Sequence, residues 1–261
     1  MKKLLKSDKL IILIASICII GILSIAFFLV GPFIRDKFTR LENFKYHYVL
    51  EPGIYEIGTH IPEGTYYVRS DVEETCYFDI YELAEDYMYC RGEYQVRDKN
   101  KLMQPTRRGM WRVEIKNRKR NIDLENGRIL MVRPNAQLLF YSNDANNDLN
   151  KIENSTLKTY KLVNRAVAGQ DFKTGVYDII YEPTDSEQNG TVACVIKFYG
   201  TYESEFTMTF DCSGSDGDQV LYKNIPFTKD SVIVTTVEGV SLVPSKVISA
   251  KLNEITSDNN N

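Results

Sequence analysis

The stretch VLEPGIYEIGTHIPEGTYYV, residues 49–68, holds the pattern Gly-x-Tyr-x-Ile/Val twice, beginning at Gly53 and again at Gly64. In each pattern the tyrosine and the β-branched residue are two positions apart, so both side chains point to one face of a β-strand. A glycine that opens a strand suits a positive φ or a close approach between chains, and Pro62 is typical of a turn. The stretch therefore predicts two neighbouring strands that enter one sheet.

The remainder of the chain carries the same kind of signal. From Tyr48 onward it is rich in Tyr, Val, Ile and Thr, in short runs separated by Gly, Pro and Asn. These are strand and turn signals, and no run of helical length has a clean 3.6-residue period. We predict an all-β fold.

An internal repeat then becomes visible. Residues 58–68, GTHIPEGTYYV, align with residues 169–179, GQDFKTGVYDI. Further blocks follow in the same order: CYFDIY from Cys76 aligns with CVIKFY from Cys194, and NIDLENGRILMV from Asn121 aligns with NIPFTKDSVIVT from Asn224. The blocks are offset by 111, 118 and 103 residues, which indicates loops that changed length between retained strands. We predict a tandem duplication with copies at 49–143 and 159–250, each a β-sandwich or barrel-like module.

The tyrosines of the repeated pattern have two interpretations. Tyr is common in strands, so we interpret Tyr55, Tyr66 and Tyr177 as sheet residues of the two copies. The alternative is a tyrosine-lined groove for a sugar or a peptide.

Two segments lack apolar periodicity. Residues 144–158 are polar and rich in Asn, and residues 251–261 end in SDNNN. We expect a linker in the first case and a disordered tail in the second.

The N-terminus predicts a membrane anchor. Four lysines lie within residues 1–9 and precede 21 uncharged residues, 10–30, which as a helix would cover about 31 Å and match the hydrocarbon thickness of a bilayer. The alternative, a cleavable signal, needs a shorter apolar run and an A-x-A site, which this stretch lacks. We predict a cytoplasmic tail at 1–9, a transmembrane helix at 10–34 and a juxtamembrane segment at 35–48. Arg35, Lys37 and Arg40 follow the span, so the positive-inside rule favours a cytoplasmic N-terminus only narrowly.

Charge excludes one class of partner. The whole chain has a formal net charge of −3, and residues 1–9 carry four Lys and one Asp, so the remainder carries −6. A mildly acidic protein is a poor match for nucleic acid, whose binding requires a basic surface.

The four cysteines beyond the anchor predict two disulfides. A hairpin folded about Leu83 would place Cys76 opposite Cys90, and one folded about Glu203 would place Cys194 opposite Cys212. Facing residues in an antiparallel pair are close enough for a disulfide. We predict Cys76–Cys90 and Cys194–Cys212, which would support an oxidising, extracytoplasmic location; the alternative is four reduced, buried thiols.

Motifs of common chemistry are missing from the sequence. It contains two histidines, His47 and His60, and no H-E-x-x-H, C-x-x-C, G-x-S-x-G or Gly-rich phosphate loop. DCSGSDGD at 211–218 fails the EF-hand pattern, because Asp216 stands where Gly is needed and Tyr222 where Glu is needed. We predict no catalytic residues, no cofactor and no metal.

One basic cluster is a candidate contact surface. Residues 107–120, RRGMWRVEIKNRKR, hold seven basic residues, and apolar and charged positions alternate through their centre, as in a strand with one charged face. This face could bind anionic lipid or a wall polymer; alternatively it is solvated and neutralised by acidic residues of the same copy. The basic contact surface that we predict consists of Arg107, Arg108, Trp111, Arg112, Lys116 and Lys119.

The opening motif resembles that of a known β-module. Residues 53–66 resemble a module of membrane-anchored and secreted proteins of Gram-positive bacteria that opens with G-x-Y-x-[VI]-G-x-[DH]-I-P-x-G-x-Y, and LENGRILMV matches its late strand. The second copy departs from the motif at Ala166, Lys173, Asp230 and Ser231. The resemblance implies an envelope location and this architecture, and no reaction.

Together these observations predict a single-pass membrane protein whose C-terminal region lies outside the cell. We expect a non-catalytic role in binding or assembly at the envelope, with another envelope protein or an anionic wall polymer as partner besides the bilayer. The alternatives are an envelope enzyme with an unrecognised carboxylate site and a structural spacer in a membrane complex.

Overall fold

The computed structural model describes residues 44–70, 76–83, 88–96, 104–105, 121–134, 136–146, 148–154, 158–198 and 204–257. The chain divides into two units, Met1–Phe44 and Lys45–Asn261, and the fold below is that of the second. The predicted anchor at 10–34 and the basic contact surface lie outside the described residues. Within the described ranges, no helix has the length and apolar character needed to cross a bilayer.

The fold is all-β, as predicted, and its sheets are built mainly from antiparallel pairs. In the first copy the strand orders are β1-β9-β3-β7 and β2-β8-β4-β5-β6. These strands are β1 (Tyr46–Leu50), β2 (Gly53–Glu56), β3 (Gly64–Ser70), β4 (Cys76–Leu83), β5 (Met88–Val96), β6 (Gln104–Pro105), β7 (Asn121–Leu124), β8 (Ile129–Val132) and β9 (Leu138–Ser142).

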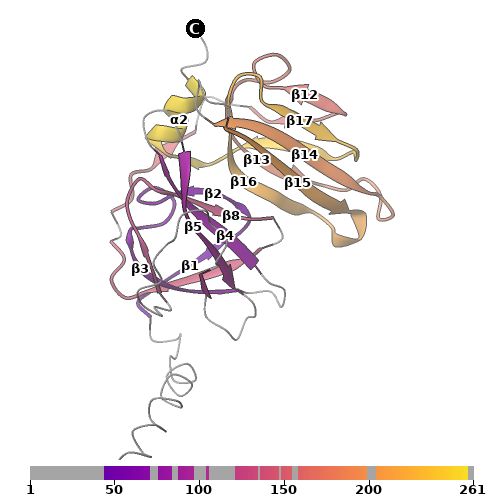
Figure 1. Cartoon of the computed structure of the whole chain (residues 1–261). Helices are drawn as coiled ribbons and strands as arrows, with labels where there is room; N and C mark the ends of the chain where they lie inside the picture. Colours follow the sequence, from indigo (N-terminus) through magenta and orange to yellow (C-terminus); the bar gives the residue numbers. More distant parts are fainter. Residues whose placement is uncertain are drawn as a thin grey trace, which may run out of the picture. The chain divides into compact units, whose positions relative to one another are not determined.

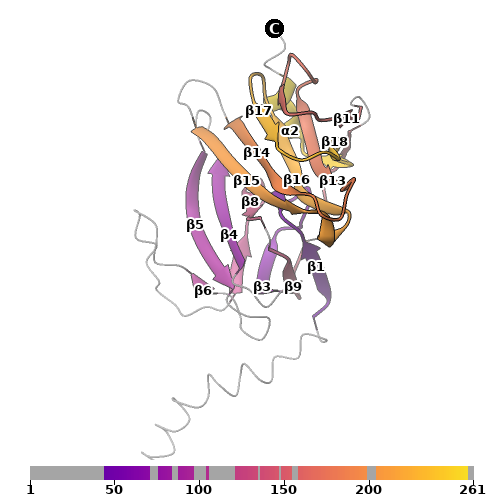
Figure 2. The same ribbon diagram turned by 90° about the vertical axis from the view of Figure 1, so that its right-hand side faces the viewer.

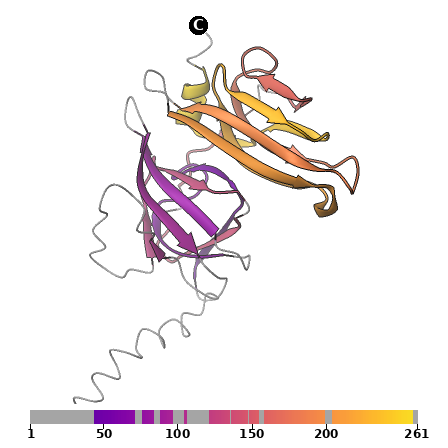
Figure 3. The same cartoon turned by 45° about the vertical axis from the view of Figure 1, so that its right-hand side comes forward.

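The second copy has the same strand order. Its sheets are β11-β18-β13-β16 and β12-β17-β14-β15, with β14 and β15 forming a long hairpin (Figures 1 and 3). The elements are β10 (Ile152–Glu153), β11 (Tyr160–Lys161), β12 (Arg165–Val167), β13 (Gly175–Tyr181), β14 (Asn189–Phe198), β15 (Ser204–Ser213), the 3-10 helix η2 (Gly214–Asp216), β16 (Gln219–Phe227), β17 (Val232–Thr235), β18 (Val240–Pro244), β19 (Val247–Ile248) and α2 (Ala250–Ser257).

The repeated sequence builds the same turn in each copy. Gly58 and Gly169 have φ of 88° and 84°, a region that favours glycine, and each donates its N–H to the carbonyl three residues later at 2.7 Å. The prediction that the two Gly-x-Tyr strands share a sheet is wrong. β2 and β3 belong to different sheets, because this turn, with its single Ile57–Ile61 bridge, carries the chain from one sheet to the other.

The tyrosines of the pattern lie inside the protein. Tyr55, Tyr66 and Tyr177 are buried, and each hydroxyl donates a 2.8 Å hydrogen bond to the carbonyl four residues earlier. The ring therefore fills the core while the hydroxyl fixes the chain before the strand. The tyrosines are sheet residues, as we predicted, and they line no groove.

The two copies are joined by a shared sheet. Lys223 of β16 pairs in parallel with Gly53 of β2, which makes one nine-stranded sheet from β11 to β6. Three apolar side chains of the first copy, Ile54, Ile129 and Met131, belong to the core cluster of the second. We call this contact the module junction.

The expected linker and tail contain structure. Within 144–158, β10 pairs with β19, and within 251–261 the chain continues helix α2. The Ser249 hydroxyl accepts the Leu252 N–H at 2.9 Å, which is an N-cap, and Leu252 is fully buried. The tail prediction was wrong for this helix, because one apolar side chain per turn is too weak a signal in a polar sequence.

The predicted disulfides are corrected by the register. Cys76 lies opposite Val96 and Cys90 opposite Tyr81; Cys194 lies opposite Met208 and Cys212 opposite Gly190. Cys76, Cys194 and Cys212 are buried, and none of these three forms a disulfide. At Cys76 and Cys194 the observed partner differs from the predicted one by an even number of residues. An even shift of register leaves every side chain on the same face of the sheet. The alternation of apolar and polar residues in the sequence therefore does not detect it.

The cysteines also fail to correspond between the copies. Phe78 pairs with Val132 of β8, and Val192 pairs with Thr235, which is the equivalent of Val132 in β17. Phe78 therefore matches Val192, an offset of 114, which pairs Cys194 with Ile80 in the structural alignment. The apparent recurrence of two cysteines per copy was a coincidence of spacing.

Candidate functional site

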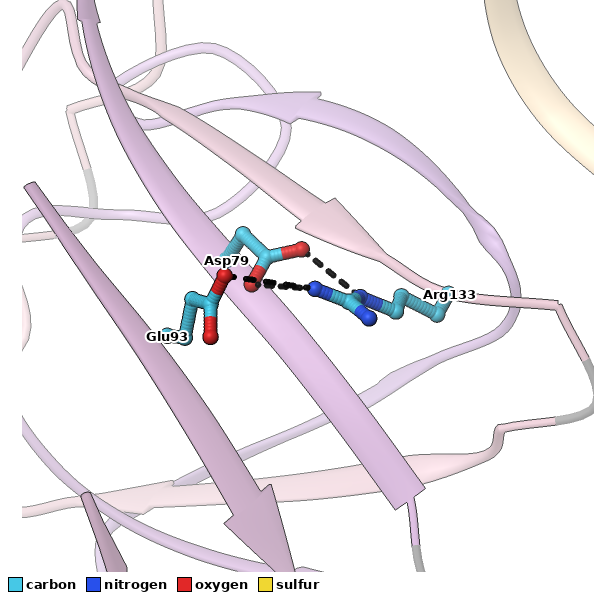
Figure 4. Close-up of polar contacts among 3 residues, drawn as sticks. All are labelled: Asp79, Glu93 and Arg133. Carbon is cyan, nitrogen blue, oxygen red and sulfur yellow. Dashed lines mark hydrogen bonds and ion pairs between the residues drawn. The ribbon is translucent and has the colours of Figure 1, made fainter. Parts of the chain in front are cut away.

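The most unusual polar cluster in the described part of the chain surrounds Asp79 (Figure 4). Asp79 lies in β4 directly opposite Glu93 of β5, and Arg133 follows β8, which pairs with the other side of β4. The cluster thus ties together three adjacent segments of one sheet. We call these three residues the Asp79 cluster.

Arg133 binds Asp79 through two hydrogen bonds. Its Nε donates to Oδ2 at 2.8 Å and its Nη2 to Oδ1 at 3.1 Å, while Nη2 lies 3.8 Å from Oε1 of Glu93. Such a two-point pair fixes the guanidinium plane. The guanidinium carbon also lies 5.7 Å from the centre of the Tyr77 ring, within the range of a cation–π contact.

Burial sets the electrostatics of the cluster. The Asp79 side chain is 4% exposed, whereas that of Arg133 is 45% exposed. Burial raises the pKa of Asp79, although the hydrogen bonds and charge of Arg133 oppose the rise. The ionised form of Asp79 is therefore poorly solvated, and its stability depends on the charge and hydrogen bonds of Arg133.

This arrangement is better suited to fixing adjacent segments of the sheet together than to catalysis. A general acid or base needs a carboxyl oxygen within reach of substrate, yet both oxygens of Asp79 accept hydrogen bonds from Arg133. Two carboxylates and one guanidinium leave a net charge of −1, which does not favour an anionic ligand. Where side chains are described, no group of three or more His, Cys, Asp or Glu could hold a metal ion.

The Asp79 cluster shares its sheet face with the module junction. Asp79 pairs with Met131, and Tyr81, two residues further along β4, pairs with Ile129. Tyr81 packs against the second copy's core, where its ring meets Phe206 of β15 edge-on at 5.8 Å. One face of the first copy is thus apolar where the second copy covers it and charged beyond.

Polar contacts complete the junction. The Lys223 N–H donates to the Pro52 carbonyl at 2.9 Å, and its ammonium forms an ion pair with Glu51. His60 accepts the Glu56 N–H on Nδ1 at 2.9 Å, so Nε2 carries the hydrogen and donates to the Val247 carbonyl at 3.1 Å. Burial lowers the pKa of His60, which keeps the ring neutral.

The sequence contained a signal for this site that we missed. Asp79 interrupts an otherwise apolar strand, CYFDIY, and Arg133 directly follows the apolar run ILMV. A charge in such a strand is rarely buried without a partner. Of the site residues that we predicted, Cys76, Cys194 and Cys212 form no disulfide, the side chain of Cys90 lies outside the described part of the chain, and so does the basic contact surface.

The 211–218 segment is a turn rather than a site. It ends β15, forms η2 and leads into β16, and Ser213 and Ser215 hydrogen-bond each other at 2.7 Å.

Comparisons of the chain with protein-family models, with curated proteins and with solved structures found no match.

Proposed function

We propose that this protein is a non-catalytic, single-pass membrane protein that displays two β-modules outside the cell for binding or assembly at the envelope. The modules form one unit, so the surfaces they present keep a fixed spacing. An envelope protein or an anionic wall polymer is the partner that fits this reading, and the bilayer holds residues 10–34.

The observation that carries the proposal is the module junction. A shared sheet, three buried apolar side chains and the Lys223 and His60 hydrogen bonds connect the copies. Both carboxylate oxygens of the buried Asp79 accept hydrogen bonds from Arg133. These features favour a fixed scaffold over a catalytic cleft, and they also suit a spacer in a membrane complex.

The membrane topology rests on the N-terminal sequence alone. Four lysines before the apolar run and three basic residues after it favour a cytoplasmic N-terminus. The free cysteines remove the support that disulfides would have given to an outside location. The resemblance of residues 53–66 to modules of Gram-positive envelope proteins agrees with the proposed location.

Location is tested by protease treatment of intact cells. With a tag at the C-terminus, we expect the tag to be lost from intact cells and a short N-terminal fragment to stay protected. A tag that is cleaved only after cell lysis would overturn the proposed topology.

Function is tested by crosslinking in intact membranes followed by recovery of partners. We expect Arg112→Glu combined with Lys116→Glu and Lys119→Glu to reduce recovery. The charge-matched control is the exposed set Lys158→Glu, Lys161→Glu and Arg165→Glu. Equal recovery from both variants would reject the basic contact surface. Turnover of an envelope substrate that is lost in Glu93→Gln, with recovery unchanged, would favour the enzyme alternative.

A further inference from the structure

Strand β15 is the last strand of its sheet. The order is β12-β17-β14-β15, and β15, which Figure 2 shows beside β14, runs for ten residues, Ser204–Ser213. It contains no proline or lysine, two of the residues that commonly protect an edge, and its charged side chains are the exposed carboxylates of Glu205 and Asp211. Among the described residues, none pairs with its outer side.

The register identifies which main-chain groups face outward. Gly214 donates its N–H to Gln188 at 2.7 Å, and hydrogen-bonded positions alternate along an antiparallel pair. Even-numbered residues of β15 therefore bond to β14. The N–H and C=O groups of Thr207, Thr209 and Asp211 point away from β14, and their side chains are exposed.

The same edge in the first copy already carries an added strand. β5 is the counterpart of β15, and β6 pairs with its outer side through Tyr94–Pro105 and Gln95–Gln104. β6 comes from the long connection 97–120 between β5 and β7. In the second copy the corresponding connection is residues 214–218, which hold η2 and are too short to return a strand.

We propose that the outer edge of β15 binds an extended, basic segment of a partner protein by strand addition. Main-chain hydrogen bonds at Thr207, Thr209 and Asp211 supply the pairing. The exposed carboxylates of Glu205 and Asp211 lie six residues apart on one face of β15, and they favour lysine or arginine at the two facing positions of the incoming strand. This edge is distinct from the basic contact surface, so either surface can fail alone.

A second copy of this chain is a poorer occupant. Antiparallel pairing of two β15 strands would bring the Glu205 and Asp211 carboxylates of both chains to one strand pair, and the register centred on Met208 would place Glu205 of each chain opposite Asp211 of the other. Like charges that face each other across a strand pair are destabilising. The edge therefore favours a partner of opposite charge.

The test uses the full chain in detergent and a synthetic nine-residue peptide that alternates valine with lysine. Hydrogen exchange is measured at single amides with and without the peptide. We expect slower exchange at Thr207, Thr209 and Asp211, and no effect from a peptide that alternates valine with glutamate. No change at these amides, or equal protection by both peptides, would overturn the proposal.

Two variants sharpen the result. Thr209→Pro removes one outward N–H without removing a bond to β14 and should weaken peptide binding by about tenfold or more, while Thr209→Val keeps the N–H and should bind normally. Replacing Glu205 and Asp211 by lysine should make β15 bind the acidic peptide in preference to the basic one. This test remains valid even if the proline variant does not fold. Slow exchange at these amides before peptide is added would mean that the chain's own segment occupies the edge, and would reject a partner in trans.

Discussion

At the scale of single residues, His60 marks the difference between the copies. Its counterpart in the second copy, Asp171, accepts the Val167 N–H at 2.8 Å, much as His60 accepts that of Glu56. Only the histidine also donates, to Val247. The first copy, which contacts the second through this residue, therefore carries a side chain whose two ring nitrogens can accept one hydrogen bond and donate another.

His60 predicts acid sensitivity. Burial lowers its pKa against the attraction of Asp178, and Lys151 lowers it further, so the unfolded chain binds the proton more readily. The free energy of unfolding should fall as the pH drops below about 6.5, by at most about 1.4 kcal/mol per pH unit. Urea unfolding at pH 7 and pH 5 measures it. His60→Asn should flatten this slope and His47→Asn should not; equal slopes in all three proteins would contradict the assignment.

The Asp79 cluster predicts a pH-dependent penalty when its cation is removed. Arg133→Met leaves Asp79 buried without a partner, which should cost about 1–3 kcal/mol at pH 7, less than for a fully buried pair because Arg133 is 45% exposed. The Asp79 pKa is already raised and would rise further, so the cost should shrink as the pH falls and the carboxyl becomes protonated.

Two variants control that measurement by chemical denaturation. Adding Asp79→Asn to Arg133→Met should restore most of the loss, because no charge then remains buried. Arg128→Met removes a pairing with the exposed Glu125 and should change the unfolding free energy by about 0.5 kcal/mol or less. A loss at Arg133 that is independent of pH would point to packing instead.

The thiols should be inert in the native protein. Burial raises the pKa of Cys194 to about 12 and that of Cys212 to about 11. At pH 8 the thiolate of Cys194 is about a thousandfold scarcer than that of an ordinary cysteine. Alkylation followed by peptide masses should label these residues only in urea, without a reductant; failure to label in urea until a reductant is added would restore the disulfides.

At the scale of elements, helix α2 predicts a stabilising role for the C-terminus. Leu252→Ala should lower the unfolding free energy by about 2–4 kcal/mol, and Ser249→Ala by about 1 kcal/mol through loss of the N-cap. Ala250→Gln, at an exposed position, should stay within about 0.5 kcal/mol. Thermal unfolding compares the three, and an unaffected Leu252→Ala would mean that the helix is not packed on the sheet.

Elements were more predictable than their pairing. Strand residues around Tyr55, Tyr66 and Tyr177 followed from alternation and from glycine, which act locally. The pairing of Cys76 with Val96 depends on where the hairpin turns, and shifts of an even number of residues look alike in sequence. Arg133 and Asp79 are 54 positions apart, so their contact depends on sheet order, which no local pattern contains.

At the scale of the whole molecule, the junction depends on a glycine. A Cβ at Gly53 would lie 2.9 Å from that of Lys223 and 3.0 Å from the Lys223 carbonyl oxygen. Gly53→Ala should separate β2 from β16 and cost about 1–3 kcal/mol, with faster hydrogen exchange at the Lys223 amide. Gly217→Ala is the control outside the junction: nothing lies within 4 Å of its Cβ, but φ is 71°, so it should lower stability through backbone strain without opening the β2–β16 contact at the Lys223 amide. An unchanged Lys223 amide in Gly53→Ala would contradict the role.

The second copy lacks the surface that makes the junction. Where the first copy has Gly53, Ile54 and Met131, the second has Asn164, Arg165 and Val234, and all three are exposed. A further module at this edge would meet the charged Arg165 where the first copy offers the apolar Ile54. The edge of β12 therefore does not repeat the junction surface of β2, much as the outer face of a terminal solenoid repeat differs from the inner stacking faces. Two replacements in one short strand, Asn164 for Gly53 and Arg165 for Ile54, separate an edge that joins modules from one that faces solvent.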